Sequence, residues 1–217
     1  LQLSGYSIPI DRESLQGWGR IELPSDSNPA DNSWQFVYAE SPVFRTVIVS
    51  DDEETGRLLK LAAGIPYDKT LKYESDVIPS SQAESIEWNR VALLLWHTTL
   101  PTGNLAKQLE SFTARGGSVV FFPPEIPDEN ELFGLRWGQW KEPKEKDQFQ
   151  ISGWRTDSDL LANTQNGTPL PIGQLAVFRS CEIPGTGTEL AQLSEGPPLL
   201  KKASTDHGSA WFCSTLP

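Results

Sequence analysis

Methionine is absent from the 217-residue sequence, and cysteine occurs only at positions 181 and 213. Because a natural protein begins with an initiator methionine, we expect the chain to be a processed or excised piece of a longer protein. The pair Cys181 and Cys213 fits one disulfide in an oxidising compartment or two buried thiols, and the spacing leaves both open. The sequence has no Cys-x-x-Cys motif and no Cys/His cluster with zinc spacing, so it predicts no metal site and no cofactor.

Positive charge is scarce. Lysine and arginine number 18 against 29 aspartate and glutamate residues, which gives a formal net charge of −11. Nucleic-acid binders need clustered basic side chains to displace counterions from phosphates. The one local basic cluster, residues 141–146, is interrupted by Glu142, Pro143 and Glu145 and is typical of a solvated loop. Nucleic acid is therefore not an expected partner.

Long hydrophobic runs are missing as well. A membrane-spanning helix needs about 20 consecutive apolar residues, whereas the longest run here, Val91 to Trp96, has the length of a strand. We therefore expect no membrane-spanning segment in this stretch of chain. The composition, with 37% hydrophobic and 22% charged residues, is that of a globular protein with one large domain or one domain and a small appendage.

The first 43 residues differ in character from the rest. They are rich in Ser, Pro, Asp and Asn, with β-like pieces at 20–23 and 34–38 separated by turn-forming residues 24–32. We expect residues 1–43 to form an N-terminal β segment or the end of a preceding β domain. Residues 44–217 are expected to form a separate α/β domain.

Short apolar runs alternate with helical patterns from Phe44 onward. Runs without polar interruption indicate strands buried on both faces, and strands that alternate with helices predict a parallel sheet with right-handed crossovers. The pattern therefore predicts a three-layer α/β domain with a mostly parallel sheet flanked by helices. The expected strands are 46–50, one within 67–81, 91–96 and 118–122; the expected helices run from the acidic residues 51–54 to Gly64 and over 103–115.

The last third of the sequence predicts a β-rich C-terminal part. Helical periodicity fades after Glu125, and strands are expected at 175–178, 196–200 and 209–212. Asp206-His207-Gly208 is typical of a hairpin turn between the last two.

Four segments carry a resemblance to a known family. Residues 47–52 (VIVSDD), 91–101 (VALLLWHTTLP) and 116–124 (GGSVVFFPP) resemble the class I glutamine-amidotransferase-like domain, and residues 189–215 are similar to the C-terminal hairpin of that family. The resemblance implies a flavodoxin-like, amidotransferase-like fold.

A narrower resemblance concerns the N-terminal part. Residues 17–24 (GWGRIELP) and 28–32 (NPADN) resemble segments of large bacterial membrane proteins of the BatA type. In those proteins a von Willebrand factor A domain and a β domain precede an amidotransferase-like domain outside the membrane. The resemblance implies a periplasmic domain of a membrane-anchored protein, with a protein partner or the other domains of the parent chain as its contacts.

The sequence departs from the catalytic pattern of the amidotransferases. Those enzymes place a Cys on a tight Gly-x-Cys-x-Gly elbow after a strand, because the thiolate must stand clear at a helix N-terminus. Here the strand that ends at Phe122 is followed by Pro123, Pro124 and Glu125, and His97 is followed by threonines rather than by the His-x-Glu pattern. We therefore expect a degenerate, non-catalytic interaction or structural domain with no catalytic residue.

Three polar residues form a candidate cleft. Asp51 and Asp52 follow one expected strand and His97 ends another, and ligands bind at the carboxyl ends of strands in open α/β sheets. The alternative function is therefore a hydrolase or a metal-dependent enzyme that uses this cleft. The competing interpretation is structural: acidic residues that begin a helix and a packed, hydrogen-bonded histidine.

Tryptophan is abundant, with eight residues. Trp137, Trp140 and Trp154 form a candidate aromatic surface for sugars or a partner chain, because indole faces supply a large contact area. A carbohydrate-binding module is thus a further alternative. The competing interpretation places these rings in the core or between domains.

Overall fold

A computed structural model describes residues 16–24, 32–39, 43–65, 68, 69, 71–143, 147–164 and 166–217. The chain divides into two compact units, Leu1–Val43 and Phe44–Pro217. Most of the expected turn, at 25–31, and residues 144–146 of the basic cluster lie outside the described residues.

The first unit contains a two-stranded antiparallel sheet. Strand β1 (Gln16–Glu22) pairs with β2 (Ser33–Ala39), and the register places Gly17 opposite Tyr38 and Gly19 opposite Phe36. The aromatic rings lie across these glycines, at positions where a β-carbon would collide with them. A two-stranded ribbon buries little apolar surface, so these ring-on-glycine contacts are an important part of its internal packing.

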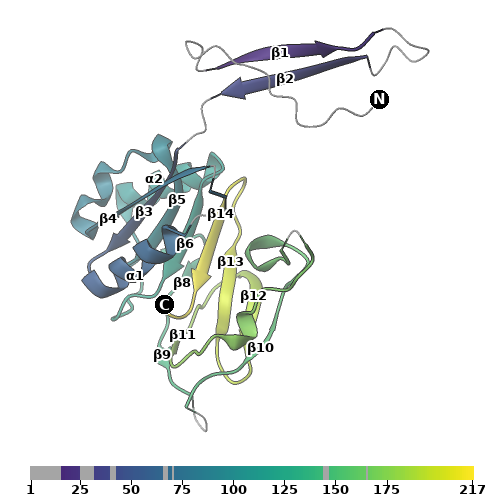
Figure 1. Cartoon of the computed structure of the whole chain (residues 1–217). Coiled ribbons are helices and arrows are strands. Elements are labelled where there is room, and N and C mark those ends of the chain that lie inside the picture. The colour runs from purple at the N-terminus through teal and green to yellow at the C-terminus, as the bar shows by residue number, and fades with distance from the viewer. Residues whose placement is uncertain are drawn as a thin grey trace. The chain divides into compact units, whose positions relative to one another are not determined.

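The second unit is built on one mixed, eight-stranded sheet with the order β10-β12-β13-β14-β6-β5-β3-β4 (Figure 1). The strands β3, β5, β6 and β14 pair in parallel, whereas β14, β13, β12 and β10 pair antiparallel. Their bounds are β3 Val43–Ser50, β4 Lys72–Ile78, β5 Val91–His97, β6 Ser118–Phe122, β10 Ile151–Trp154, β12 Gly187–Leu193, β13 Pro198–Ala203 and β14 Ser209–Cys213.

The α/β class predicted from the sequence is confirmed, but the sheet is mixed rather than mostly parallel. The β-rich C-terminal part continues the same sheet, because the short links at 194–197 and 204–208 can join only antiparallel neighbours. The strand expected at 175–178 is reduced to a single bridge between Val177 and Phe149. A 3₁₀ turn, η5 (Ile172–Gln174), immediately precedes that position and takes the backbone out of an extended course.

Both expected helices are present. Helix α1 (Glu53–Ala63) contributes Leu59 to a buried cluster with Ile48 of β3, and α2 (Gly103–Ala114) contributes Leu109 to a second cluster with Val47. Val47 and Ile48 enter different clusters because successive strand residues point to opposite faces. The remaining described elements are short: β7 Glu131–Leu132, β8 Leu135–Arg136, β9 Trp140–Lys141, β11 Ser180–Cys181, and the 3₁₀ helices η2 Ser80–Ser85, η3 Trp88–Arg90 and η4 Asp159–Leu161.

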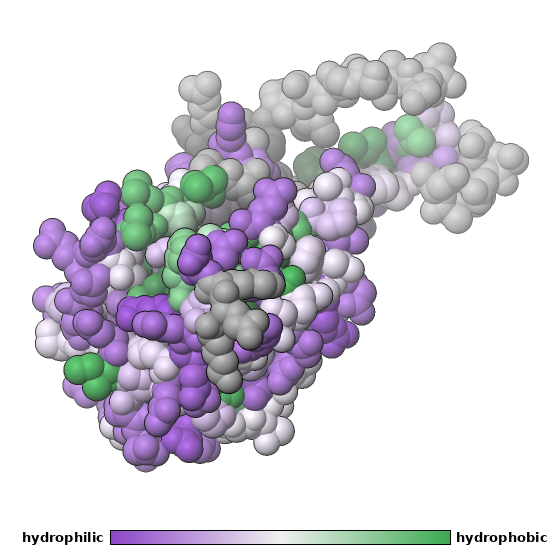
Figure 2. All heavy atoms as spheres, turned by 90° about the horizontal axis from the view of Figure 1, so that it is seen from below, coloured by the Kyte–Doolittle hydropathy of each residue, from purple (hydrophilic) through white to green (hydrophobic). Residues whose placement is uncertain are grey.

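The surface agrees with the acidic, polar composition. On the side shown in Figure 2, hydrophilic residues cover most of the surface and hydrophobic residues appear in small separate groups. Among the described residues, neither α1 nor α2 nor any other helix has the length and apolar character needed to cross a membrane.

A buried lysine ties the antiparallel half of the sheet to a neighbouring loop. Lys201 of β13 is only 7% exposed, and its Nζ donates hydrogen bonds to the carbonyl oxygens of Ile183 (3.2 Å) and Gly185 (2.8 Å). Gly185 has a φ of +114°, a conformation that favours glycine, and a β-carbon there would collide with the Gly134 carbonyl. The Lys201 ammonium group therefore holds the loop at Ile183 and Gly185, which approaches the backbone at Gly134 closely.

Replacement of Lys201 by methionine tests this anchor. The methionine fills similar space but leaves two carbonyls without their donor, so we expect a loss of about 2 kcal/mol in the free energy of unfolding, measured by urea denaturation. The matched change Lys107→Met on the exposed face of α2 should alter stability by less than about 0.5 kcal/mol. Equal effects of the two substitutions would contradict an anchoring role for Lys201.

Candidate functional site

The three residues of the predicted cleft lie at one edge of the sheet. The parallel register places Ser50 of β3 beside His97 of β5, so Asp51 and Asp52 follow directly at the same edge. Asp51 accepts hydrogen bonds at Oδ1 from the Ser80 backbone N–H (2.8 Å) and at Oδ2 from Thr98 Oγ1 (3.2 Å). Burial acts to raise the pKa of Asp51, but these hydrogen bonds outweigh it and the pKa is lowered. Asp51 thus joins the ends of β3 and β5 to η2.

Asp52 is the N-cap of α1. Its Oδ1 accepts a hydrogen bond from the backbone N–H of Thr55 at 2.7 Å, and its backbone is extended, as an N-cap requires. Hydrogen bonding from Thr55 lowers the pKa of the Asp52 carboxyl. The carboxylate is therefore ionised and committed to the first turn of the helix.

His97 is a buried imidazole, 7% exposed, whose Nδ1 lies 3.0 Å from Ser50 Oγ. The Ser50 hydroxyl donates to the Asp52 carbonyl oxygen at 2.8 Å, so its proton is committed there and the imidazole donates from Nδ1–H. Nε2 is then the unprotonated nitrogen, and no described residue donates a hydrogen bond to it. Burial lowers the pKa of His97 more than the nearby Asp52 and Asp51 raise it, so the ring is neutral at pH 7.

The polar side chains of Asp51, Asp52 and His97 bond mainly to neighbouring parts of the chain. Within the described part of the chain, no group of three or more His, Cys, Asp and Glu side chains is placed to hold a metal ion. The carboxylates of Asp51 and Asp52 both accept hydrogen bonds from the scaffold. His97 Nε2 accepts no hydrogen bond from the described residues, but the atom is buried and does not face an open cleft.

The loop after β6 is covered by a tryptophan and an arginine side chain. Pro123 and Pro124 are buried, and Trp140 Nε1 donates to the carbonyl oxygens of Pro124 (3.2 Å) and Glu125 (3.1 Å). The guanidinium of Arg179 lies 4.1 Å from the centre of the Trp140 ring. The indole and the cation therefore cover this loop.

Both cysteines are free thiols, which decides between the two alternatives that the sequence left open. Cys181 is fully buried and its Sγ lies 3.4 Å from the Gly138 carbonyl oxygen, to which it donates. Burial raises the pKa of Cys181 to about 11 and also raises the pKa of Cys213. Neither thiol has the lowered pKa of a cysteine nucleophile.

The predicted aromatic surface is not formed, and this corrects the sequence interpretation. Trp137 is only 1% exposed and packs at 5.2 Å from Phe212, in the cluster on one face of the sheet, whereas Trp154 packs against the cluster on the other face. Trp140 is partly exposed, but Arg179 covers its ring. Sugar stacking needs open indole faces on a common surface, and the three rings do not provide one.

An apolar pocket of about 310 Å³ is a feature that the sequence did not predict. One wall belongs to β6, β13 and β14, and the other to η4, η5 and the residue after η5. Its lining residues are Val120, Phe122, Leu160, Leu161, Ile172, Leu175, Leu199, Leu200, Cys213 and Thr215.

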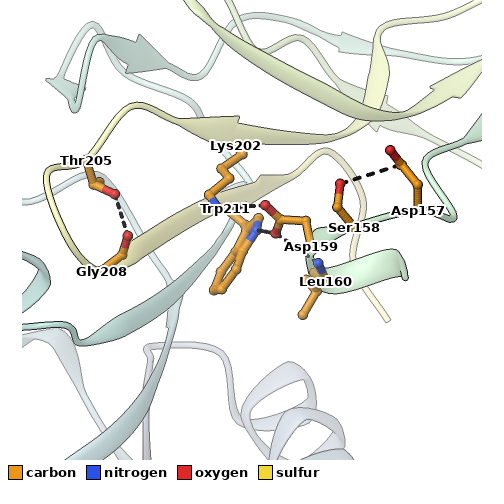
Figure 3. A network of polar contacts seen from close by, with 8 residues as sticks. All are labelled: Asp157, Ser158, Asp159, Leu160, Lys202, Thr205, Gly208 and Trp211. Carbon is orange, nitrogen blue, oxygen red and sulfur yellow. Dashed lines mark hydrogen bonds and ion pairs between the residues drawn. The ribbon is translucent and has the colours of Figure 1, made fainter. Parts of the chain in front are cut away.

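A polar network holds η4 against the sheet beside this pocket (Figure 3). Asp159 Oδ1 accepts from Trp211 Nε1 (2.7 Å) and from the backbone N–H of Leu160 (2.8 Å), and Oδ2 accepts from Lys202 Nζ (2.6 Å). Asp159 has a φ of +69°, which a non-glycine residue rarely adopts. Burial acts to raise the pKa of Asp159, but the three hydrogen bonds together lower it. We refer to these contacts as the Asp159 latch.

Comparisons with known proteins give no family. No family model matches the chain, and no curated protein matches it by sequence. Solved structures do match the chain, among them the following two. The exo-β-1,4-mannosidase Op5Man5 from Opitutaceae bacterium strain TAV5 is 13% identical over 81% of this chain and 31% of its own, with a TM-score of 0.45. A ThuA-like protein from Bacteroides uniformis ATCC 8492 is 11% identical over 82% of this chain and 84% of its own, with a TM-score of 0.39.

The chain thus spans about a third of the length of the mannosidase, at 31%. Neither likeness identifies a family or a function for this protein.

The tautomer of His97 can be tested directly. ¹⁵N-detected NMR of the imidazole should show a proton on Nδ1 and an unprotonated Nε2, with a pKa below the ordinary 6.5 because burial disfavours the charged ring. In Ser50→Ala the acceptor of the Nδ1–H is lost, and the two tautomers should become mixed. An Nε2-protonated ring in the unmodified chain would contradict the assignment.

The Asp159 latch predicts a pH-dependent contribution to stability. Asp159→Asn keeps the shape and tolerates the positive φ, but it removes the charge, and we expect a loss of about 1.5–3 kcal/mol at pH 7. Because the folded-state pKa is lowered, the stabilisation is present above the ordinary value of 3.8 and is lost as the pH falls through the folded-state pKa. Urea unfolding at several pH values should therefore show the two proteins converging in acid.

Asp157→Asn, at an exposed carboxylate two residues away, is the matched control and should change the stability by less than about 0.5 kcal/mol, because its ion pair with Arg155 is open to solvent. A gap between Asp159→Asn and the unmodified chain that stays constant down to pH 2.5 would exclude the charge as the source of the effect.

Proposed function

We propose that this chain is a non-catalytic interaction domain with a three-layer, amidotransferase-like fold, and that it belongs to a larger membrane-anchored bacterial protein. In this proposal α1 and α2 cover opposite faces of the parallel strands, in line with their membership of the two buried clusters. The domain faces the periplasm, as the resemblance of residues 17–24 and 28–32 implies. Its partner is a protein or another domain of the parent chain.

The observation that carries the proposal is the use of polar side chains at the carboxyl edge of the sheet. Asp51 joins two strand ends, Asp52 caps α1, and the Ser50 hydroxyl and His97 Nδ1 bond to each other. Groups that catalyse proton transfer or nucleophilic attack need to face a reacting atom. Here these groups instead stabilise the junction between strands and helices.

The two other functions considered from the sequence have less support. A hydrolase or metal-dependent enzyme at Asp51, Asp52 and His97 would need His97 Nε2 open to a ligand, but this atom is buried and both carboxylates accept hydrogen bonds from the scaffold. A carbohydrate-binding module would need Trp137 and Trp154 exposed together, and they pack on opposite faces of the sheet.

Glutamine hydrolysis and thiol reactivity test the proposal together. We expect no release of ammonia from glutamine above the buffer rate, because burial raises the pKa of Cys181 and Cys213 and keeps both thiols protonated at pH 7. In Cys213→Ala, a thiol-specific disulfide reagent should modify Cys181 at least about tenfold more slowly in the folded chain than in urea. Ammonia release that alkylation abolishes would overturn the proposal, and Cys181→Ala and Cys213→Ala would then identify the nucleophile.

A further inference from the structure

The apolar pocket lies between the sheet and the chain that runs from β10 to β11. Its floor comes from three neighbouring strands, and its opposite wall from η4 and η5. Leu160 and Leu175 on that wall are 46% and 53% exposed, so the apolar lining continues to the surface. Protein interiors are normally packed to the density of organic crystals. An open apolar hollow of about 310 Å³ is therefore a place where these side chains have not closed upon each other.

The chemistry of the lining restricts what can enter. Eight of the ten lining residues carry pure hydrocarbon side chains, and the other two are Cys213 and Thr215. Asp159, next to Leu160 on the wall, bonds to Lys202 at 2.6 Å, so the two charges neutralise one another. Lys201, next to Leu200, donates its hydrogen bonds to the carbonyl oxygens of Ile183 and Gly185. A charged ligand would lose its hydration without gaining a partner, which is costly. An uncharged apolar molecule gains the full benefit of leaving water.

The size of the pocket restricts the ligand further. Ligand sites of proteins usually range from about 300 to 1,000 Å³, and an apolar cavity of about 150 Å³ is enough for benzene. A volume of about 310 Å³ therefore suits a molecule of about two rings or an equivalent short hydrocarbon. The Asp159 latch holds η4 in place before any ligand arrives, which reduces the ordering cost of binding.

We propose that this pocket binds a small, uncharged, apolar molecule, with Cys213 on its wall. The pocket shares no lining residue with Asp51, Asp52 or His97, although Phe122 pairs with His97 in the sheet. It does not depend on the proposed absence of catalysis at those three residues, so either proposal can fail without the other.

Fluorescence titration of the full 217-residue chain with N-phenyl-1-naphthylamine, an uncharged two-ring probe, tests the site. We expect saturable binding at one site and binding at least about tenfold weaker for the charged analogue 1-anilinonaphthalene-8-sulfonate. Leu175→Glu places a carboxylate at the mouth of the pocket and should lower the affinity for the uncharged probe by about tenfold or more. Leu61→Glu, at a leucine of α1 that is 59% exposed, is the matched control and should bind within about twofold of the unmodified chain.

Thiol labelling locates the probe independently. In Cys181→Ala the only thiol is Cys213, and saturating probe should slow its reaction with N-ethylmaleimide by about threefold or more, because a ligand in the pocket covers Sγ. Circular dichroism and urea midpoints verify that each variant is folded. The proposal is overturned by non-saturable binding, by equal losses in Leu175→Glu and Leu61→Glu, or by unprotected Cys213. A further outcome would also overturn it: no probe binding, together with a dimer in sedimentation that Leu175→Glu dissociates. The pocket would then be occupied by a second copy of the chain.

Discussion

The parallel pairing of β14 with β6 is the contact on which the larger unit depends. It joins the half of the sheet that carries the helices to the antiparallel half formed by β10, β12 and β13. Alternation along β14 gives each face an aromatic anchor. Phe212 stacks on Phe121 at 4.6 Å on one face, and Trp211 bonds to Asp159 on the other. A slip of one residue in this pairing would exchange the two faces and disrupt both contacts.

The carboxyl edge of the sheet and the face beside β14 carry different kinds of side chain. At the carboxyl edge, polar side chains satisfy the backbone and one another, as in the Asp52 cap and the Ser50–His97 contact. Beside β14, the chain between β10 and β11 lies over an apolar floor without filling it. The pocket thus lies where the parallel and antiparallel halves of the sheet meet, with Phe122 and Cys213 at the carboxyl ends of β6 and β14.

Local sequence patterns determined much of the fold in advance. The apolar runs of β3, β5 and β6 and the acidic start of α1 are properties of a few neighbouring residues, and each element appears where its pattern predicts it. The approach of Asp51, Asp52 and His97 also followed, because parallel strands end at one edge. The mixed sheet did not follow, since the order of strands across a sheet depends on long-range pairing that no local pattern records.

The candidate aromatic surface and the pocket show where sequence reasoning stops. An indole in a short irregular strand has no periodic pattern to fix its direction, so the burial of Trp137 depends on Phe212, which lies far along the chain. The Asp159 latch joins residues 43 and 52 positions apart. Its backbone conformation at φ +69° also contradicts the usual preference of aspartate.

That unusual conformation persists because the surroundings over-determine it. A residue held in a sparsely populated backbone region costs on the order of 1–3 kcal/mol, and three hydrogen bonds to one carboxylate are sufficient to offset such a cost. If the only role of η4 were to cover the sheet, its leucines could pack onto the floor without a strained, charged attachment. The latch instead fixes η4 at a distance that leaves the apolar pocket open, which favours recognition over simple closure as the role of this segment.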